Sequence, residues 1–206
     1  ELKRLNRLIT DVSNASRLDA ELARQAMVPT LITDVVDNVA KIFRDILSED
    51  GRSVRVVLDQ GVDRQTLKVT GHEGRLGQVI TNLVDNAVSF SPADGVVVIT
   101  VKQSPQHVDI VIDDEGPGIP EDRLAIIFDR FYTDRPQSEA LRGKNSGLGL
   151  SISREIVIAH GGEIWAENRR AAGSAAESRP VGARFTVRLP RLITTARGGS
   201  GGSRRY

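Results

Sequence analysis

The chain has 206 residues, 39% of them hydrophobic, which is enough to bury a sizeable core in one main domain with an appendage. Lysine and arginine number 28 against 27 aspartates and glutamates, so the formal net charge of +1 creates no global field toward nucleic acid, which we do not expect as a partner. The absence of cysteine excludes disulfides and thiolate metal sites and is typical of a reducing compartment.

The ends of the sequence suggest a soluble piece of a longer protein. No apolar run approaches the roughly 20 residues that a membrane-spanning helix needs. The sequence also begins at Glu1 without an initiator methionine and in the middle of a periodic pattern. We therefore expect any targeting or membrane segment to lie outside these residues.

The first predicted element is an amphipathic helix over residues 2–22, whose apolar residues recur at steps of three and four (Leu2, Leu5, Ile9, Val12, Ala15). A stripe of this kind needs a partner helix. Pro29 biases the preceding residue away from helical angles and removes a backbone donor. The sequence therefore predicts a hinge over residues 27–30.

A second amphipathic helix is predicted from Leu31 to Phe43, with Thr30 or Thr33 as its N-cap and an end near residues 48–51. Two β-branched runs follow at residues 54–58 and 66–69. Because turn-prone residues separate them, we expect these two strands to pair as a hairpin.

The middle of the chain alternates one helix with two strands. Residues 73–90 have helical periodicity, and residues 96–101 and 108–112 are rich in β-branched side chains. The turn-prone sequence at 103–106 joins these strands. A short helical pattern then runs from Leu124 to Phe128.

The last third begins with a polar and basic stretch over residues 130–145, which we interpret as a mobile loop. A helix is predicted over 148–160, ended by Gly161 and Gly162, and strands over 163–167 and 184–189. Residues 170–182 form a loose connection. The Gly/Ser/Arg-rich residues 196–206 are expected to be disordered or an added linker.

These elements do not follow strict βαβ alternation, which favours an α+β fold. We predict a two-layer α/β sandwich, with a mixed, mostly antiparallel sheet and helices on one face, preceded by the long amphipathic helix. The expected division is residues 1–28, 29–190 and 191–206.

The helix over 73–90 carries a polar stripe of Arg75, Gln78, Asn82, Asn86 and Ser89. Asparagine is a poor residue in the middle of a helix, and two of them stand one turn apart. A neutral amide oxygen suits Mg²⁺ beside a triphosphate because it adds no further negative charge. We expect Asn86 to be the metal ligand, the alternative being a solvated polar face.

Asp114 follows a predicted buried strand and precedes Gly116-Pro117-Gly118. Glycines allow the backbone to turn tightly and a flat ring to approach. A carboxylate accepts a hydrogen bond from the N6 amine of adenine, whereas the O6 of guanine would repel it. The alternative is a surface turn capped by the aspartate.

A third motif, Ser146 to Leu150, opens the helix predicted over 148–160. Free N–H groups at a helix start form an anion site, and glycine lets a phosphate approach. Nearby basic side chains are expected to close over the phosphates (Arg130, Arg135, Arg142, Lys144). The spacing excludes a Walker A loop and a protein-kinase glycine loop. Together the three motifs describe an ATP pocket.

In this order and spacing, the motifs resemble the catalytic ATP-binding domain of bacterial sensor histidine kinases, within the Hsp90-like (GHKL) ATPase superfamily and its Bergerat fold. The resemblance covers residues 1–190. It identifies residues 82–90 as the N box, 114–119 as the G1 box, 128–131 as the F box, 146–150 as the G2 box and 182–185 as the closing strand signature. Residues 1–28 resemble the second helix of the dimerisation and phosphotransfer domain, and their sequence is similar to that of ChvG-type sensor kinases.

The resemblance implies ATP and Mg²⁺ as cofactors and catalytic roles for Asn82, Arg130 and Lys144. The implied nucleotide contacts are Asn82, Asn86, Ser89, Phe90, Asp114, Gly116, Gly118, Ile119, Ser146, Gly147, Leu148, Gly149 and Leu150. Ser89 and Phe90 depart from the family, which commonly has lysine and tyrosine there. One phosphate contact is therefore missing or supplied by the loop.

The implied function is transfer of the ATP γ-phosphate to a histidine upstream of this sequence. That histidine would lie on the dimerisation helix of a homodimer, and the phosphate would pass to a response-regulator receiver domain. The implied location is the cytoplasmic part of an inner-membrane sensor protein. We expect structural or surface roles for His72, His107 and His160, so this piece alone should not phosphorylate itself.

Two alternatives stay open. In the first, ATP binding drives the conformational cycle of an ATPase; by resemblance, such ATPases have a glutamate where this chain has Asn82. In the second, the pocket is degenerate and serves only as an interaction module, which predicts no nucleotide binding.

Overall fold

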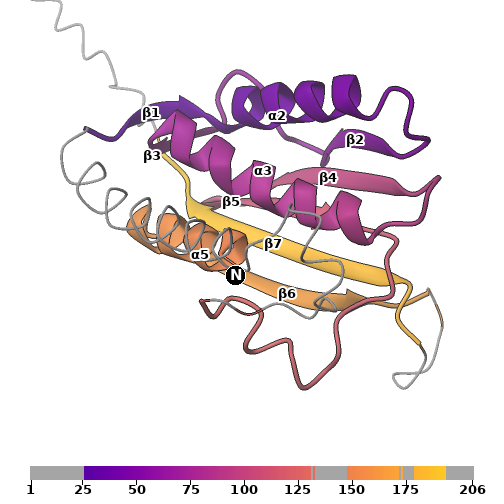
Figure 1. Ribbon diagram of the computed structural model, residues 1–206. Helices are drawn as coiled ribbons and strands as arrows, with labels where there is room; N and C mark the ends of the chain where they lie inside the picture. The colour runs from indigo at the N-terminus through magenta and orange to yellow at the C-terminus, as the bar shows by residue number, and fades with distance from the viewer. Residues whose placement is uncertain (1–25, 131, 133–147, 172, 174–178, 194–206) are drawn as a thin grey trace, which may run out of the picture.

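The computed structural model describes residues 26–130, 132, 148–171, 173 and 179–193 (Figure 1). Its elements in chain order are β1 (Val28–Leu31), α2 (Ile32–Ile46), β2 (Ser53–Leu58), β3 (Lys68–Gly71), α3 (Glu73–Phe90), β4 (Val96–Gln103), β5 (His107–Asp113), α5 (Gly149–Ala159), β6 (Glu163–Arg169) and β7 (Gly182–Pro190). The helix expected over 2–22, the loop over 133–145 and the tail over 196–206 lie outside the described residues.

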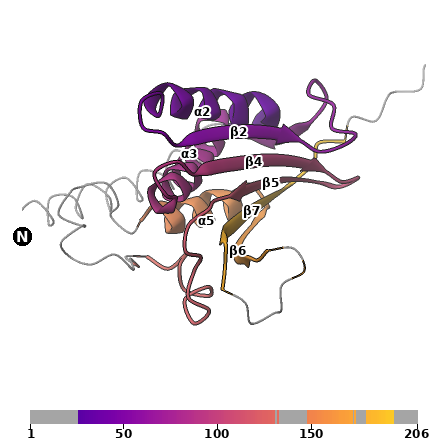
Figure 2. The ribbon, with the colours of Figure 1, turned by 90° about the vertical axis from the view of Figure 1, so that its right-hand side faces the viewer.

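Five strands form one sheet in the order β2-β4-β5-β7-β6. Only β2 and β4 are parallel; the other three pairings are antiparallel. Helices α2, α3 and α5 cover one face of this sheet, as the two views show (Figures 1 and 2). The predicted α+β sandwich is confirmed.

The hairpin predicted from the two runs at 54–58 and 66–69 is wrong. Strand β2 pairs in parallel with β4, with Ser53 opposite Val96. Strand β3 pairs instead with β1 in a separate two-stranded sheet. The reason lies at Leu67, which is fully buried and whose carbonyl accepts the N–H of Ile32, so that the chain crosses to the start of α2.

The region around Pro29 is a strand rather than the predicted hinge. Because β1 is an edge strand, the missing N–H of proline costs little. Both N-cap predictions are also wrong: Leu31 is the N-cap of α2 and makes no side-chain cap. Thr30 donates through Oγ1 to the Gly71 carbonyl, and Thr33 donates to the Arg64 carbonyl. The Thr30 hydroxyl therefore ties β1 to β3, and the Thr33 hydroxyl ties the start of α2 to the segment before β3.

The helical pattern expected from Leu124 to Phe128 is a run of turns. The N–H of Arg123 donates to Pro120, and those of Ile126 and Ile127 donate to Arg123. Phe128 nevertheless faces the core, where its ring meets that of Phe185 edge-on at a centroid distance of 6.4 Å.

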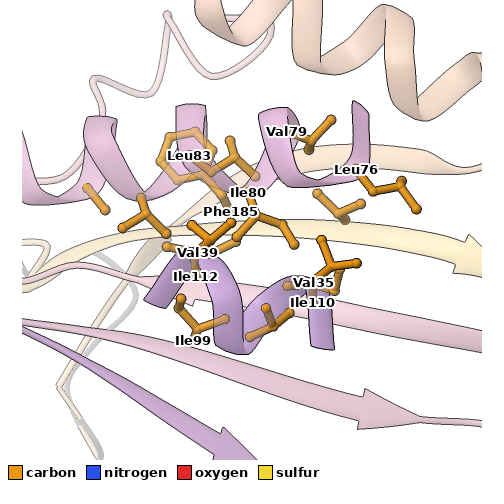
Figure 3. Packing of buried hydrophobic residues seen from close by; sticks show 14 of the residues in the cluster. Val35, Val39, Leu76, Val79, Ile80, Leu83, Ile99, Ile110, Ile112 and Phe185 are labelled. Carbon is orange, nitrogen blue, oxygen red and sulfur yellow. The ribbon is translucent and has the colours of Figure 1, made fainter. Parts of the chain in front are cut away.

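The main core lies between the sheet and its three helices (Figure 3). In the central strands the buried row recurs at every second residue, as in Ile110 and Ile112 of β5. On the opposite face, Asp109 and Asp113 form bidentate ion pairs with Arg188 and Arg184 on β7. Since side chains alternate, Asp114 continues the buried row of β5 and faces the helices.

Candidate functional site

The polar stripe of α3 faces the start of α5. The amide Nδ2 of Asn82 donates to the Gly149 carbonyl at 3.0 Å and to Ser153 Oγ at 3.2 Å. A Cβ at Gly149 would lie 3.6 Å from Asn82 Cγ, which is ordinary contact. The predicted N box and the helical part of the G2 box are therefore joined by direct hydrogen bonds.

Asp114 is held by the backbone through one carboxylate oxygen. Its Oδ1 accepts the N–H of Gly116 and the N–H of Ala183, both at 2.9 Å. The residue is 2% exposed, and burial raises the pKa of its carboxyl although the two N–H bonds oppose that shift. Oδ2 makes no hydrogen bond to the part of the chain that the structure describes. The geometry thus leaves one oxygen of a largely buried carboxyl as an acceptor for a ligand.

The turn after Asp114 packs against the end of α3. A Cβ at Gly116 would lie 2.9 Å from the carbonyl oxygen of Phe90, so only glycine fits there without displacement. Gly118 has φ of +81°, a conformation that favours glycine. Phe90 itself is 39% exposed. The structure therefore brings the N box and the G1 box side by side.

Asn86 lies one turn after Asn82 and is half-buried. The described residues include no cluster of three or more histidines, cysteines or carboxylates that would hold a metal by itself. An amide oxygen that shares its cation with phosphate oxygens and water fits the way proteins hold Mg²⁺. Asn86 is therefore compatible with Mg²⁺ bound together with a nucleotide. Ser89 donates through Oγ to the Asn86 carbonyl.

The start of α5 is compatible with an anion. Its N-cap, Leu148, makes no side-chain cap, so this residue leaves the first-turn N–H groups of α5 uncapped. Arg130, predicted to close over the phosphates, instead donates to Glu155 Oε1 on α5, with its Nε at 3.0 Å. A phosphate role for Arg130 requires that pair to open. Arg135, Arg142, Lys144, Ser146 and Gly147 lie outside the described residues.

Two of the three histidines are buried at the junction of α3 and α5. His160 accepts the backbone N–H of His72 at its Nε2, at 3.1 Å, and donates from Nδ1 to the Ile156 carbonyl, at 2.7 Å. Burial lowers the pKa of His160, so the neutral ring is favoured. These contacts support structural roles for both.

Three residues that contact Asp114 and its loop were not predicted as site residues from the sequence. Arg169 donates from Nη1 to the Asp114 carbonyl. A Cβ at Gly182 would lie 2.0 Å from that same carbonyl oxygen. Asn168 bonds to Ile119 at the end of the loop. Of these three, only Asn168 could have been suspected from the sequence, because asparagine is depleted in strands.

The chain has clear similarity to known proteins. Residues 71–193 match the family described as histidine kinase-, DNA gyrase B- and HSP90-like ATPase. The sensor protein ChvG of Rhizobium meliloti (strain 1021) is 45% identical over 196 residues, which are 92% of this chain and 33% of ChvG. The chain spans about a third of the length of the curated relatives it matches.

Two solved structures have the same fold. Full-length ShkA in complex with AMPPNP superposes with a TM-score of 0.69 at 25% identity, covering 93% of this chain and 37% of ShkA. Histidine kinase ThkA in complex with response regulator protein TrrA gives 0.67 at 26% identity, covering 92% of this chain and 49% of the other. Among the helices that the structure describes, none is long and apolar enough to cross a membrane.

Proposed function

Because the chain belongs to the histidine kinase-, DNA gyrase B- and HSP90-like ATPase family, we propose that it is the ATP-binding catalytic module of a sensor histidine kinase. The observation that carries this proposal is Asp114, a buried carboxylate with Oδ1 fixed by two N–H groups and Oδ2 left without a hydrogen bond in the described part of the chain. An acceptor fixed in this way selects a base that presents an amine at the six position, where adenine has its N6 donor and guanine has its O6 acceptor.

The phosphate side of the pocket would be formed by α3 and α5. Asn86 would supply an amide oxygen to Mg²⁺, and the N–H groups that open α5 would receive a phosphate. When bound, the metal neutralises charge on the phosphates. The chain's own part is to orient the nucleotide, since phosphoryl transfer depends mainly on positioning and on charge stabilisation.

Position 82 supports transfer over hydrolysis. A hydrolase needs a base that takes a proton from water, and an asparagine amide has no such basicity. Asn82 is also engaged through Nδ2 with Gly149 and Ser153. A pocket built this way holds ATP without activating water, which suits a donor of phosphate to another group.

The acceptor is proposed to be a histidine elsewhere in the full-length protein. His72 and His160 are both buried, and the backbone N–H of His72 donates to Nε2 of His160, so neither ring is placed to receive phosphate. We propose that the segment before β1 belongs to the dimerisation and phosphotransfer domain of a homodimer, with a response-regulator receiver domain as the next acceptor. The full-length protein would be anchored in the inner membrane with this module in the cytoplasm. The ThkA–TrrA complex supports the receiver partner by analogy.

The test uses full-length protein incubated with γ-labelled ATP and Mg²⁺. We expect label on the protein that is lost in acid and retained in base, the behaviour of phosphohistidine. Label released mainly as free phosphate would contradict the kinase proposal and favour the ATPase alternative. An absence of any nucleotide binding would favour the interaction module.

A further inference from the structure

The row of β6 that faces the helices ends in a polar residue. Ile164 and Ala166 of this row pack against the main core, and Asn168 is the next residue in the same alternation. Its cross-strand partner is Ala183 on β7. An amide therefore occupies a place where the pattern leads one to expect an apolar side chain.

The Asn168 side chain makes two hydrogen bonds to one backbone residue of the loop after Asp114. Its Oδ1 accepts the N–H of Ile119 and its Nδ2 donates to the Ile119 carbonyl, both at 2.7 Å. The amide thus pairs with Ile119 as a neighbouring strand would. Both polar groups of a residue outside any strand are satisfied by a single side chain.

The loop lies directly on this amide. A Cβ at Gly118 would come 2.7 Å from Asn168 Oδ1 and 2.6 Å from Pro180 Cβ, and φ at Gly118 is +81°. Neither contact leaves room for a side chain. The loop is therefore seated on Asn168 and Pro180 by close backbone approach as well as by hydrogen bonds.

The two ends of the loop are bonded to the same place in the sheet. At its start, Asp114 Oδ1 accepts the N–H of Ala183. At its end, Ile119 is bonded to Asn168, which stands opposite Ala183. The strands β6 and β7 therefore hold both ends of the loop at a set separation.

A second contact, between the region after the loop and the residue that follows β6, is weaker. Arg170 and Glu121 form an ion pair at 2.8 Å, but their side chains are 31% and 71% exposed. Ion pairs this exposed contribute little. The Asn168 bridge, which is shorter and bidentate, is the contact that restrains the position of Ile119.

We propose that Asn168 is a positioning residue that sets base selectivity by holding Ile119 at a set distance from Asp114. This inference rests on the proposed function, since it assumes that Asp114 receives the base. It adds a residue that touches no nucleotide: Asn168 acts through the backbone of Ile119.

The experiment compares Asn168→Ala with the wild-type chain, using ATP and GTP as probes. We expect Asn168→Ala to lower the ratio of ATP to GTP affinity by about tenfold, the effect of two lost hydrogen bonds on a loop beside the base. The Ile119 amide should also exchange faster with solvent. Asn38→Ala, the same change on the exposed side of α2, is the matched control and should leave both readings unchanged.

A merely structural role gives a different result. General destabilisation would lower the affinity for both nucleotides by the same factor and leave the ratio unchanged, and that outcome would overturn the proposal. If Asn168→Ala fails to fold, Asn168→Asp replaces it, since a carboxylate keeps the acceptor for the Ile119 N–H but loses the donor to its carbonyl. Asn168→Asp should keep the Ile119 amide protected and still lose selectivity, and unchanged selectivity there would refute the inference.

Failure of the proposed function is distinguishable. A wild-type chain that binds neither nucleotide would refute the proposed function and this inference with it. A wild-type chain that prefers ATP, beside variants that prefer it equally, would refute only the role of Asn168.

Discussion

The substitution Asp114→Asn tests the two carboxylate oxygens of Asp114 separately: Oδ1, which the backbone holds, and Oδ2, which we propose faces the base. An asparagine Oδ1 can keep both hydrogen bonds that Asp114 Oδ1 accepts, from Gly116 and Ala183. The second oxygen, Oδ2, is replaced by an NH₂ group, so an acceptor becomes a donor. We therefore expect a folded protein whose base contact is reversed.

The magnitude follows from what is lost. A hydrogen bond to a charged group contributes about 1.5 to 3 kcal/mol, and a buried donor facing the adenine amine leaves both groups unpaired. The ATP affinity should fall by roughly 100-fold, equivalent to about 2.7 kcal/mol.

The free energy of unfolding of Asp114→Asn should be unchanged or higher than that of the wild type, although its ATP affinity falls. Burial raises the pKa of Asp114, so the folded state retains the proton to higher pH than the unfolded chain. Above the unfolded pKa, the ionised carboxylate therefore costs folding free energy, and this cost is complete above the folded pKa. At pH 7.5 the neutral amide removes that cost, so the unfolding midpoint should be unchanged or higher.

The assay pairs calorimetric titration of Mg·ATP with urea denaturation at pH 7.5. Asp109→Asn is the matched control: it removes a carboxylate that binds Arg188 on the opposite face of the sheet and should leave ATP affinity unchanged. An Asp114→Asn variant that binds ATP as tightly as the wild type would refute the base-selecting role. A large loss of stability would refute the assignment of Oδ1 as the structural acceptor.

Three further predictions concern the frame of the site. Gly182→Ala places a Cβ 2.0 Å from the Asp114 carbonyl at φ of +147°. Urea denaturation should therefore show a loss of about 2 to 4 kcal/mol in the free energy of unfolding. The control Gly74→Ala, at a position with open space around it, should show no such loss. Burial lowers the pKa of His160 from 6.5, so the unfolding free energy should fall as the pH drops below that value; a value unchanged between pH 7.5 and 5.5 would count against this. Asn86→Asp should weaken Mg·ATP binding about tenfold by adding a charge beside the phosphates, and an unaltered Mg²⁺ dependence would exclude Asn86 as the ligand.

Elements whose signal is local can be predicted from the sequence. The helix over 73–90 agrees to the residue because its apolar positions recur with helical spacing. Strands β4 and β5 agree for a similar reason, since their buried row alternates cleanly. Asp114 stands out because an acidic residue directly follows a strand whose buried row alternates cleanly and precedes two glycines, although the same pattern also predicts the turn in which Asp114 Oδ1 accepts the N–H of Gly116.

Pairings set by distant contacts cannot be predicted in this way. β2 carries the same β-branched signal whether it pairs with β3 or with β4, and the decision depends on where Leu67 is buried. Pro29 predicts a break because proline lacks an N–H, but in an edge strand such as β1 that N–H is not needed. Whether a strand lies at an edge is decided by the tertiary structure and cannot be predicted from the local sequence. Asn168 gives only one weak signal, an asparagine in a strand, and its partner Ile119 lies 49 residues away.

The most direct test of the central claim is a single-turnover measurement on this chain with Mg·ATP, following bound nucleotide and released phosphate together. A pocket with Asp114 for the base and no water-activating carboxylate at position 82 predicts saturable binding of ATP that remains intact while bound. Rapid release of phosphate from the bound nucleotide, or no saturable binding, would contradict the account.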